Sequence, residues 1–186
     1  MSYVGELGWE LYVPASRAPA VYDALTAGGD VVDAGYYALE SLRMEKAYRA
    51  WGRELTPEDT PLEAGMGFTV SWDKPGGFLG REALLEQRRR GITRRLLLFA
   101  LADPEVMAWG EEPVYRDDEL VGILTSAAYG HTVGGVVAMG YVPLRPGEAA
   151  EGLLAGRYEV DVAGTRVPAR VSLRAWLDPS GARMKV

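Results

Sequence analysis

Apolar and polar residues follow two different spacings along the chain, and the change falls near Gly91. Before Gly91, apolar residues recur at the three- and four-residue intervals of amphipathic helices, with short apolar runs between them. After it, they alternate every second residue over short segments, as in strands with one buried face. The pattern predicts an α+β segment over residues 1–91 and an all-β domain over residues 92–186.

The first segment is predicted to contain three main helices and three short strands. Ser16 can cap the first helix, Gly28 and Gly29 end it, and Gly91 ends the third. A capping box that begins at Thr60 predicts one further short helix. The main helices are expected at residues 16–27, 35–48 and 80–90, and the strands at residues 3–13, 31–32 and 68–72.

The second segment is predicted to form a small antiparallel barrel or sandwich. Its strand-like stretches are short and closely spaced, and little of it reads as helix. Asp117-Asp118 and Ala163-Gly164 are typical of two-residue hairpin turns. The strands are expected at residues 95–101, 112–115, 120–126, 136–142, 158–162 and 166–173.

The α+β segment offers few strands against which to bury its helices. Its first strand-like stretch also begins within three residues of the N-terminus. We therefore expect this segment to pack against polypeptide that the chain lacks, which suggests a truncated protein. An apolar face left open in this way favours self-association, so a homodimer is expected more often than a monomer.

Composition excludes several kinds of site and partner. The 186 residues contain no cysteine, which excludes disulfides, thiolate nucleophiles and cysteine-bound zinc, and no metal site is expected. The only histidine, His131, is expected in a turn with a structural role. The net charge of −6 argues against nucleic acid as the main partner. No membrane-spanning run or signal pattern is readable, so the sequence predicts a soluble, cytoplasmic protein.

Arg43 is the first candidate for a binding role. At 100° per residue it lies in the middle of the apolar face of the helix predicted over residues 35–48. A cation in that position is costly unless it is paired. Two interpretations remain open, namely a structural ion pair with Glu40 and an anion-binding guanidinium at the edge of a cleft.

Glu6 and Glu10 are the second candidate. On a regular strand, residues four apart point to the same side, so the two carboxylates would lie together. They could form a solvated strand face, or they could bind a polar ring, because a carboxylate accepts two parallel N–H bonds from an edge such as that of a pterin. Gly5 and Gly8 would permit close approach of the backbone. Nearby aromatic residues could stack on a planar ligand, namely Tyr3, Trp9, Tyr36, Tyr37, Tyr48, Trp51 and Trp72.

The same segments carry a family resemblance. Residues 2–11 (SYVGELGWEL) resemble the Y-x-G-E-x-G-x-E segment of the glycine-cleavage T-protein, or aminomethyltransferase, family. Residues 39–52 (LESLRMEKAYRAWG) resemble the family's S/T-L-R-x-E helix, and residues 54–66 continue the similarity. Residues 78–84 (FLGREAL) match its F-x-G-R/K-x-x-L pattern. Within this family, the sequence of these segments is most similar to the folate-handling regions of dimethylglycine and sarcosine dehydrogenases.

This resemblance implies a partial folate-binding fold followed by the family's C-terminal barrel. Its implied cofactor is tetrahydrofolate, with Glu10 or Glu6 at the pterin edge, Arg43 near the ring or glutamyl tail, and Tyr3 beside them. The implied reaction transfers a one-carbon unit from an aminomethyl or iminium donor to tetrahydrofolate. The family's key aspartate lies in an N-terminal half that this sequence lacks, so no catalytic residue is expected here. That half, or a flavoprotein subunit, is the expected partner. The alternative is a non-catalytic folate-binding or interaction module associated with an amine dehydrogenase or oxidase.

Overall fold

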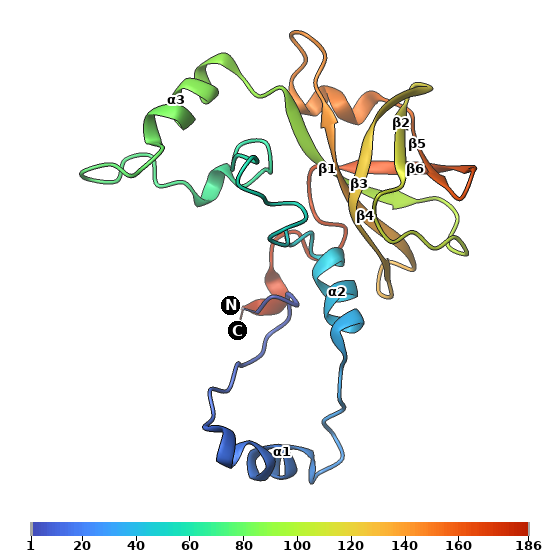
Figure 1. Cartoon of the computed structure of the whole chain (residues 1–186). Coiled ribbons are helices and arrows are strands. Elements are labelled where there is room, and N and C mark those ends of the chain that lie inside the picture. Colours follow the sequence, from blue (N-terminus) through green and yellow to red (C-terminus); the bar gives the residue numbers. More distant parts are fainter. Residues whose placement is uncertain (1, 186) are drawn as a thin grey trace.

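The computed structural model describes residues 2–185, and its centre is a closed barrel of six antiparallel strands (Figure 1). The strands follow one another around the barrel in the order β1-β4-β3-β2-β5-β6, and pairing of β6 with β1 closes it. Closure leaves no strand edge unpaired, which suits a short-stranded sheet. The strands are β1 (Arg94–Leu101), β2 (Pro113–Arg116), β3 (Glu119–Gly130), β4 (Gly135–Pro143), β5 (Tyr158–Val162) and β6 (Thr165–Ser172). The predicted barrel is thereby confirmed.

Both predicted hairpin turns are present. Asp117 and Asp118, between β2 and β3, have φ values of 53° and 69°. Ala163 and Gly164, between β5 and β6, have φ values of 52° and 85°. Positive φ at both central residues is the type I′ geometry that matches the twist of the flanking strands.

The barrel is filled by apolar side chains, and β1 is buried on both of its faces. Leu97 and Phe99 point into the barrel, whereas Leu96 and Leu98 point outward into a second apolar cluster. Met44 of the helix α2 (Tyr36–Glu45) belongs to that outer cluster. The interior cluster also includes Leu101, Val114, Leu124, Val136, Ala138, Val142, Leu153, Val160 and Val167. Packing of α2 on the barrel therefore explains why nearly all of β1 is apolar.

Helix α2 is anchored to the β3–β4 hairpin by polar contacts. Ser41 donates to the carbonyl of Tyr129 at 2.6 Å. The Glu45 carboxylate accepts from the backbone N–H groups of Thr132 and Val133 at 2.7 and 2.8 Å. A C-terminal tail then crosses the end of the helix, where Lys46 pairs with Asp178 at 2.6 Å. These bonds fix α2 against one end of the barrel.

The three strands predicted before the barrel are absent from the described residues, and this part of the prediction is wrong. Residues 3–13, 31–32 and 68–72 form turns, bends and extended chain, with the 3-10 turn η2 (Gly67–Thr69) inside the last stretch. A strand needs a neighbour for its backbone hydrogen bonds, and the described chain places none beside these segments. An alternation of apolar and polar residues is therefore not sufficient for a strand to form. Within residues 2–185, every strand of this α+β protein lies in the barrel.

The predicted helices are confirmed, with shorter ends. The turn η1 (Ala15–Arg17) leads into α1 (Ala18–Thr26), and α3 (Arg81–Arg90) stops at Gly91. Helix α2 ends three residues early because Ala47 adopts a left-handed φ of 55°. The Thr60–Glu63 capping box forms, with bonds of 3.2 and 3.4 Å, but Gly65 at φ 72° stops it after one turn. The short helix expected there is therefore only a turn.

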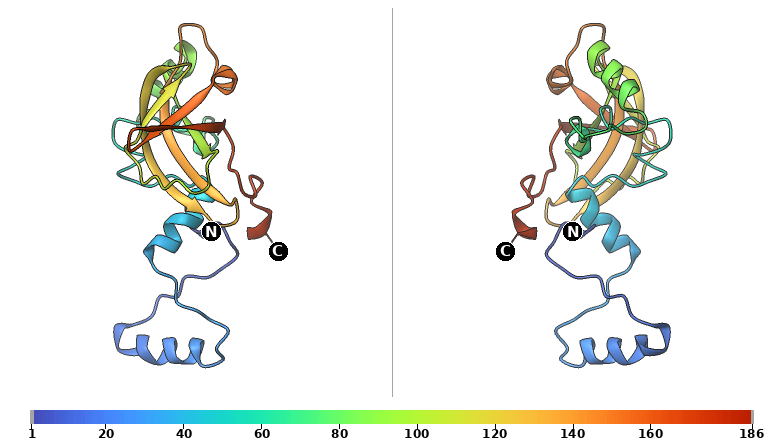
Figure 2. Two further views of the ribbon diagram at one scale, coloured as in Figure 1. Left: turned by 90° about the vertical axis from the view of Figure 1, so that its right-hand side faces the viewer. Right: turned by 90° about the vertical axis from the view of Figure 1, so that its left-hand side faces the viewer.

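An arm of residues 5–35, which contains α1, projects away from the barrel (Figures 1 and 2). None of the residues of α1 is buried. The last residue of α3 is Arg90 and the barrel begins at Arg94. A division into domains at residues 91 and 92 stays a prediction. Among the described residues, no helix is long and apolar enough to cross a membrane.

Two strand glycines differ in the space around them, and this generates a prediction. A Cβ added to Gly140 would lie 2.8 Å from the Ile123 carbonyl oxygen, whereas at Gly135 the nearest atom is 3.9 Å away. We expect Gly140→Ala to lower the free energy of unfolding by about 1–3 kcal/mol, because backbone atoms cannot yield as a side chain can. Gly135→Ala serves as the control and should change it by much less. Urea denaturation measures both, and equal effects would contradict the packing argument.

The connection between β4 and β5 carries a buried ion pair with a pH signature. Arg116, which is 4% exposed, forms a two-pronged bond with Glu148, and this bond lowers the pKa of Glu148 to about 2. A carboxyl whose folded-state pKa is depressed stabilises the fold above its unfolded pKa of about 4.3 and loses that contribution as pH falls toward the folded value. We therefore expect stability to decline between about pH 4.3 and 2.

The variant Glu148→Gln should remove part of that decline, and Glu151→Gln on the same connection should leave it in place. Thermal unfolding followed across this pH range separates the two variants. A decline of the same size in Glu148→Gln would show that other carboxylates cause it.

Candidate functional site

Arg43 lies at the centre of a fully buried cluster of charged and polar groups. It has no exposed surface, and its guanidinium forms an ion pair with Glu40 and a second pair with Glu54 at 2.9 Å. It also donates to the Ser126 hydroxyl at 2.8 Å and to the Tyr48 carbonyl at 3.0 Å. Burial alone would lower its pKa, but the hydrogen bond to Glu40 and the nearby carboxylate charges raise it overall.

Glu54 connects this cluster to the outer face of the barrel. Its carboxylate accepts from the Thr125 hydroxyl and from the backbone N–H of Ala50, both at 2.8 Å. Its own carbonyl accepts from the Tyr141 hydroxyl at 2.8 Å. The cluster therefore joins α2, the loop of residues 48–55 and the strands β3 and β4.

Of the two interpretations left open for Arg43, the geometry displays the structural ion pair with Glu40. No atom of Arg43 reaches solvent in this conformation. A direct contact between Arg43 and a ligand would require the buried cluster to open. The polar partners of Arg43 also account for a cation on an otherwise apolar helical face.

Tyr3 lies close to this cluster and remains partly accessible. Its hydroxyl donates to the Arg49 carbonyl at 3.3 Å, and its ring centroid is 6.3 Å from that of Tyr48. Partial burial raises the pKa of Tyr3, and the Arg43 charge opposes that shift. Tyr3 is 41% exposed, so one side of its ring is free to contact another molecule.

Glu6 and Glu10 are both accessible, but they have different partners. Glu6 pairs with Arg183 of the C-terminal tail at 3.0 Å, whereas Glu10 accepts from the Tyr12 hydroxyl at 3.0 Å. The regular strand that would have turned both carboxylates to one side is absent. Gly5 does permit a close approach, but its neighbour is Lys46, whose side chain lies 2.3 Å from the place of a Cβ on Gly5. Gly8 has no neighbour within 4 Å of that place.

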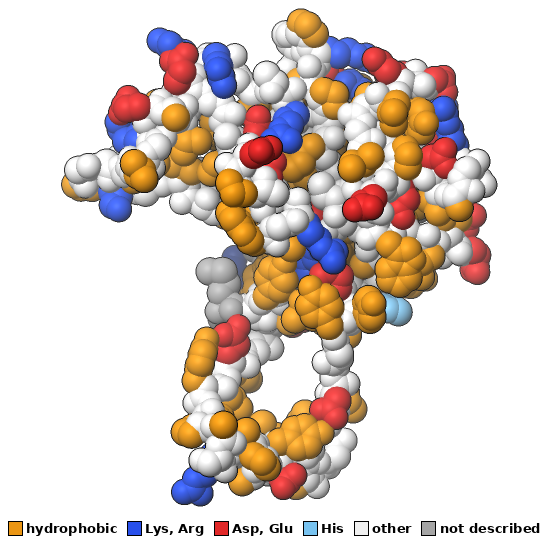
Figure 3. Space-filling view, in the orientation of Figure 1, with side chains coloured by type: hydrophobic (Ala, Val, Ile, Leu, Met, Phe, Trp, Pro, Cys, Tyr) orange, Lys and Arg blue, Asp and Glu red, His pale blue; other side chains and the backbone are white. Residues whose placement is uncertain are grey.

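A cavity of about 240 Å³ opens on the other side of Glu40, where the first half of α2 meets the barrel. Aromatic rings line it, from Tyr36 and Tyr37 on α2, Trp109 in the loop after β1, and Tyr129 at the end of β3. Arg53 and His131 also border it, the latter in the β3–β4 turn where a turn was predicted. Hydrophobic side chains gather on this part of the surface in Figure 3.

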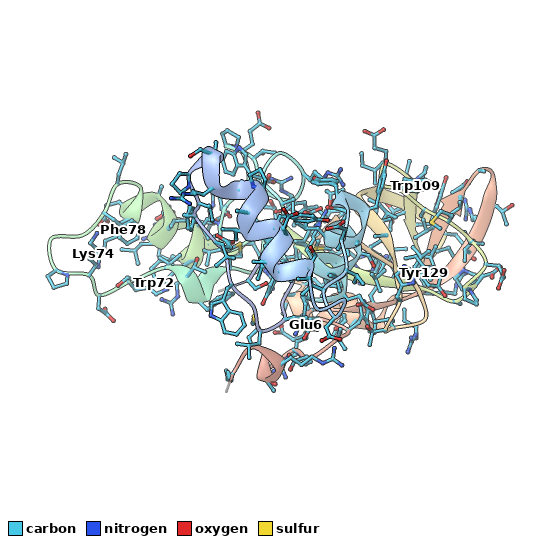
Figure 4. The ribbon with its side chains drawn as sticks, turned by 90° about the horizontal axis from the view of Figure 1, so that it is seen from below. Glu6, Trp72, Lys74, Phe78, Trp109 and Tyr129 are labelled. Atoms are coloured by element: carbon cyan, nitrogen blue, oxygen red, sulfur yellow. The ribbon has the colours of Figure 1, made fainter. Side chains whose placement is uncertain are left out.

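No sequence pattern singled out Trp109, Tyr129 or Arg53 as candidates. Trp109 lies in a loop without periodicity, and Tyr129 belongs to a strand whose inward and outward positions are set by the barrel. Seen from below, Trp109 and Tyr129 lie on the barrel side, Trp72, Lys74 and Phe78 lie on the α3 side, and Glu6 lies between them (Figure 4). The aromatic cavity and the accessible carboxylate of Glu6 are thus two separate places.

The buried cluster generates a prediction about stability. Replacing Arg43 with methionine would leave the buried Glu54 carboxylate without a cation and Glu40 with Arg53 alone, which costs about 3–5 kcal/mol of unfolding free energy. The control is Arg53→Met, because Arg53 pairs with the same Glu40 but its side chain is 42% exposed. That change should cost about 1 kcal/mol or less. Urea titration measures both variants, and a loss for Arg43→Met no larger than for Arg53→Met would contradict the buried-pair reading.

The sequence and the fold of this chain are both similar to those of known proteins. The family model described as the GCVT N-terminal domain matches residues 1–74, and the glycine cleavage T-protein C-terminal barrel domain matches residues 94–178. A crystal structure of glycine cleavage system aminomethyltransferase T from Bartonella henselae superposes with a TM-score of 0.80 at 26% identity. It is matched over 91% of this chain and 46% of its own.

Two curated relatives are similar to this chain over its whole length. The 4-methylaminobutanoate oxidase (formaldehyde-forming) of Paenarthrobacter nicotinovorans is 44% identical over all of this chain and 22% of its own length. Human mitochondrial sarcosine dehydrogenase is 38% identical over all of this chain and 21% of its own. The chain thus spans about one fifth of the length of these relatives. From the two matched regions and the shared fold, the chain belongs to the glycine cleavage T-protein (aminomethyltransferase) family.

Proposed function

We propose that this chain is the tetrahydrofolate-binding part of a one-carbon transfer system and is inactive by itself. The observation that carries the proposal is that the Y-x-G-E-x-G-x-E segment keeps both carboxylates and leaves them accessible. Glu6 is bound only to Arg183 and Glu10 only to Tyr12 among the described residues. Both pairs are on the surface, so a ligand can displace them at little cost.

A carboxylate on this segment suits the pterin edge of folate. That edge presents two neighbouring N–H donors, which one carboxylate can accept side by side. Glu10 is the preferred candidate, with Glu6 next. The partly exposed ring of Tyr3 supplies an aromatic surface for the planar pterin.

Arg43 enters this proposal as a positioning residue. It holds Glu40, Glu54 and the 48–55 loop, and the Tyr3 hydroxyl bonds to Arg49 in that loop. The buried cluster therefore fixes the surface against which Tyr3 packs. Arg43 would therefore affect binding of the folate ring or glutamyl tail indirectly, by holding these residues in place.

The proposed reaction joins a one-carbon unit to tetrahydrofolate. The name of one relative describes an oxidase that forms formaldehyde. Formaldehyde condenses with the two folate nitrogens to give 5,10-methylene-tetrahydrofolate and water. An iminium donor gives the same product and releases its protonated amine in place of water. The acid–base group for that step is assigned to polypeptide outside this chain, either the rest of the family's folate domain or a flavoprotein partner.

A second function is favoured by the arm of residues 5–35. Many of its large apolar side chains are exposed, namely Leu7, Trp9, Leu11, Tyr12, Tyr22, Leu25, Val31 and Val32. Such a surface is typical of a protein–protein contact. On this reading the chain is an assembly module for an amine dehydrogenase or oxidase, and in isolation it pairs with a second copy. The cytoplasm is the proposed compartment for either function.

Calorimetric titration with 5-formyl-tetrahydrofolate tests the folate proposal. We expect saturable binding that Glu10→Gln weakens by tenfold or more, because a hydrogen bond to a charged group contributes about 1.5–3 kcal/mol. Glu6→Gln should have the same direction with a smaller size. The control is Glu119→Gln, an exposed carboxylate on β3, which should leave binding unchanged.

Circular dichroism first establishes that each variant is folded. Equal binding by wild type and Glu10→Gln would remove Glu10 from the site. Absence of binding by the folded chain, together with a dimer in sedimentation, would favour the assembly module.

A further inference from the structure

The cavity beside Glu40 is lined by several aromatic side chains, and it contains none of the residues assigned to folate. Two pairs of rings meet there edge to face. Tyr37 and Trp109 lie with centroids 6.1 Å apart at 70°, and Tyr129 and His131 lie 5.1 Å apart at 62°. All four of these residues line the cavity, and the face of an aromatic ring attracts cations. Aromatic side chains gathered around one space are also the residues with which proteins recognise methylated ammonium groups.

Two charged side chains, Glu40 and Arg53, also line the cavity. Glu40 borders the cavity with a carboxylate that is almost fully buried, since only 10% of its side chain is exposed. Arg53 donates to Glu40 through Nη1 at 2.9 Å and, among the described residues, makes no further bond through its other guanidinium nitrogens. With 42% of its side chain exposed, Arg53 can offer those nitrogens to a carboxylate in the cavity.

Glu40 and Arg53, the acidic and basic side chains that line the cavity, carry opposite charges, and so do the buried groups behind them. Arg43 and Arg53 face Glu40 and Glu54 in one connected set of ion pairs. A ligand with a net charge would unbalance this set, whereas a zwitterion would not. The volume of about 240 Å³ leaves room for a small organic ligand.

We propose that this cavity binds a small zwitterion that carries a methylated ammonium group and a carboxylate. The ammonium methyl groups lie among the rings of Tyr37, Trp109 and Tyr129, and the carboxylate binds Arg53. Glu40, already held by two arginines, orients Arg53 toward the cavity. This inference is independent of folate binding, since it uses neither Tyr3, Glu6 nor Glu10.

Glycine betaine is the probe, and two analogues remove one charge each. In 3,3-dimethylbutanoate a carbon replaces the quaternary nitrogen, so shape and carboxylate remain while the cation is lost. Choline keeps the trimethylammonium group and lacks the carboxylate. We expect betaine to bind in the millimolar range by ligand-observed nuclear magnetic resonance, and each analogue to bind at least about fivefold more weakly.

Matched variants locate the site. Trp109→Leu should weaken betaine about threefold to thirtyfold, as expected for loss of a cation–π contact, whereas Trp51→Leu, at a similarly exposed tryptophan outside the cavity, should not. Arg53→Gln should weaken betaine and abolish its advantage over choline, whereas Arg145→Gln should not. Thermal unfolding confirms that the four variants are folded.

Three results would overturn the proposal. The first is no binding of betaine by the folded wild-type chain. The second is equal binding of betaine and 3,3-dimethylbutanoate, which would make the cavity a site for apolar anions. The third is equal loss in Trp109→Leu and Trp51→Leu. A parallel titration with 5-formyl-tetrahydrofolate keeps this test separate from that of the folate site.

Discussion

The buried ion pairs of Arg43 hold α2 and the loop of residues 48–55 against the barrel. A guanidinium with no exposed surface needs carboxylates on more than one side, and Glu40 and Glu54 supply them from α2 and from the loop that follows. The same carboxylates bond to the barrel through Thr125 and, by way of Arg43, Ser126. Breaking one member would strand the others in a low-dielectric interior, so the set is present as a unit.

Both candidate sites depend on this unit, on its opposite sides. Tyr3 packs against the 48–55 loop that Glu54 and Arg43 organise, and the accessible Glu6 follows three residues later. On the other side, Glu40 and Arg53 border the aromatic cavity. Arg43 can therefore influence either site without touching a ligand. A rigid charged core with accessible groups around it is a suitable support for binding residues, because it limits their freedom before a ligand arrives.

The arm of residues 5–35 obeys a different constraint. Its apolar side chains are exposed and α1 buries none of its residues, so the described chain gives this segment few contacts (Figure 3). Solvent exposure of that much apolar surface is unfavourable, and further polypeptide packed on the arm would relieve it. The matched part of the aminomethyltransferase structure from Bartonella henselae is 46% of that chain, which leaves room for such a partner segment in the family fold.

The sequence by itself determined the features that depend on local chemistry. The alternation of residues, the Asp117-Asp118 and Ala163-Gly164 turns and the glycine after α3 predicted the barrel, its hairpins and the helices, because strand period, turn type and helix ending are set by nearby residues. Only the tertiary structure decided which apolar segments become strands, since a strand requires a neighbour that residues 3–13 do not have. It also revealed the burial of Arg43 and its partner Glu54, eleven residues away, which are invisible to helical spacing. The cavity around Trp109 and Tyr129 was likewise out of reach, since barrel closure and the docking of α2 bring its rings together.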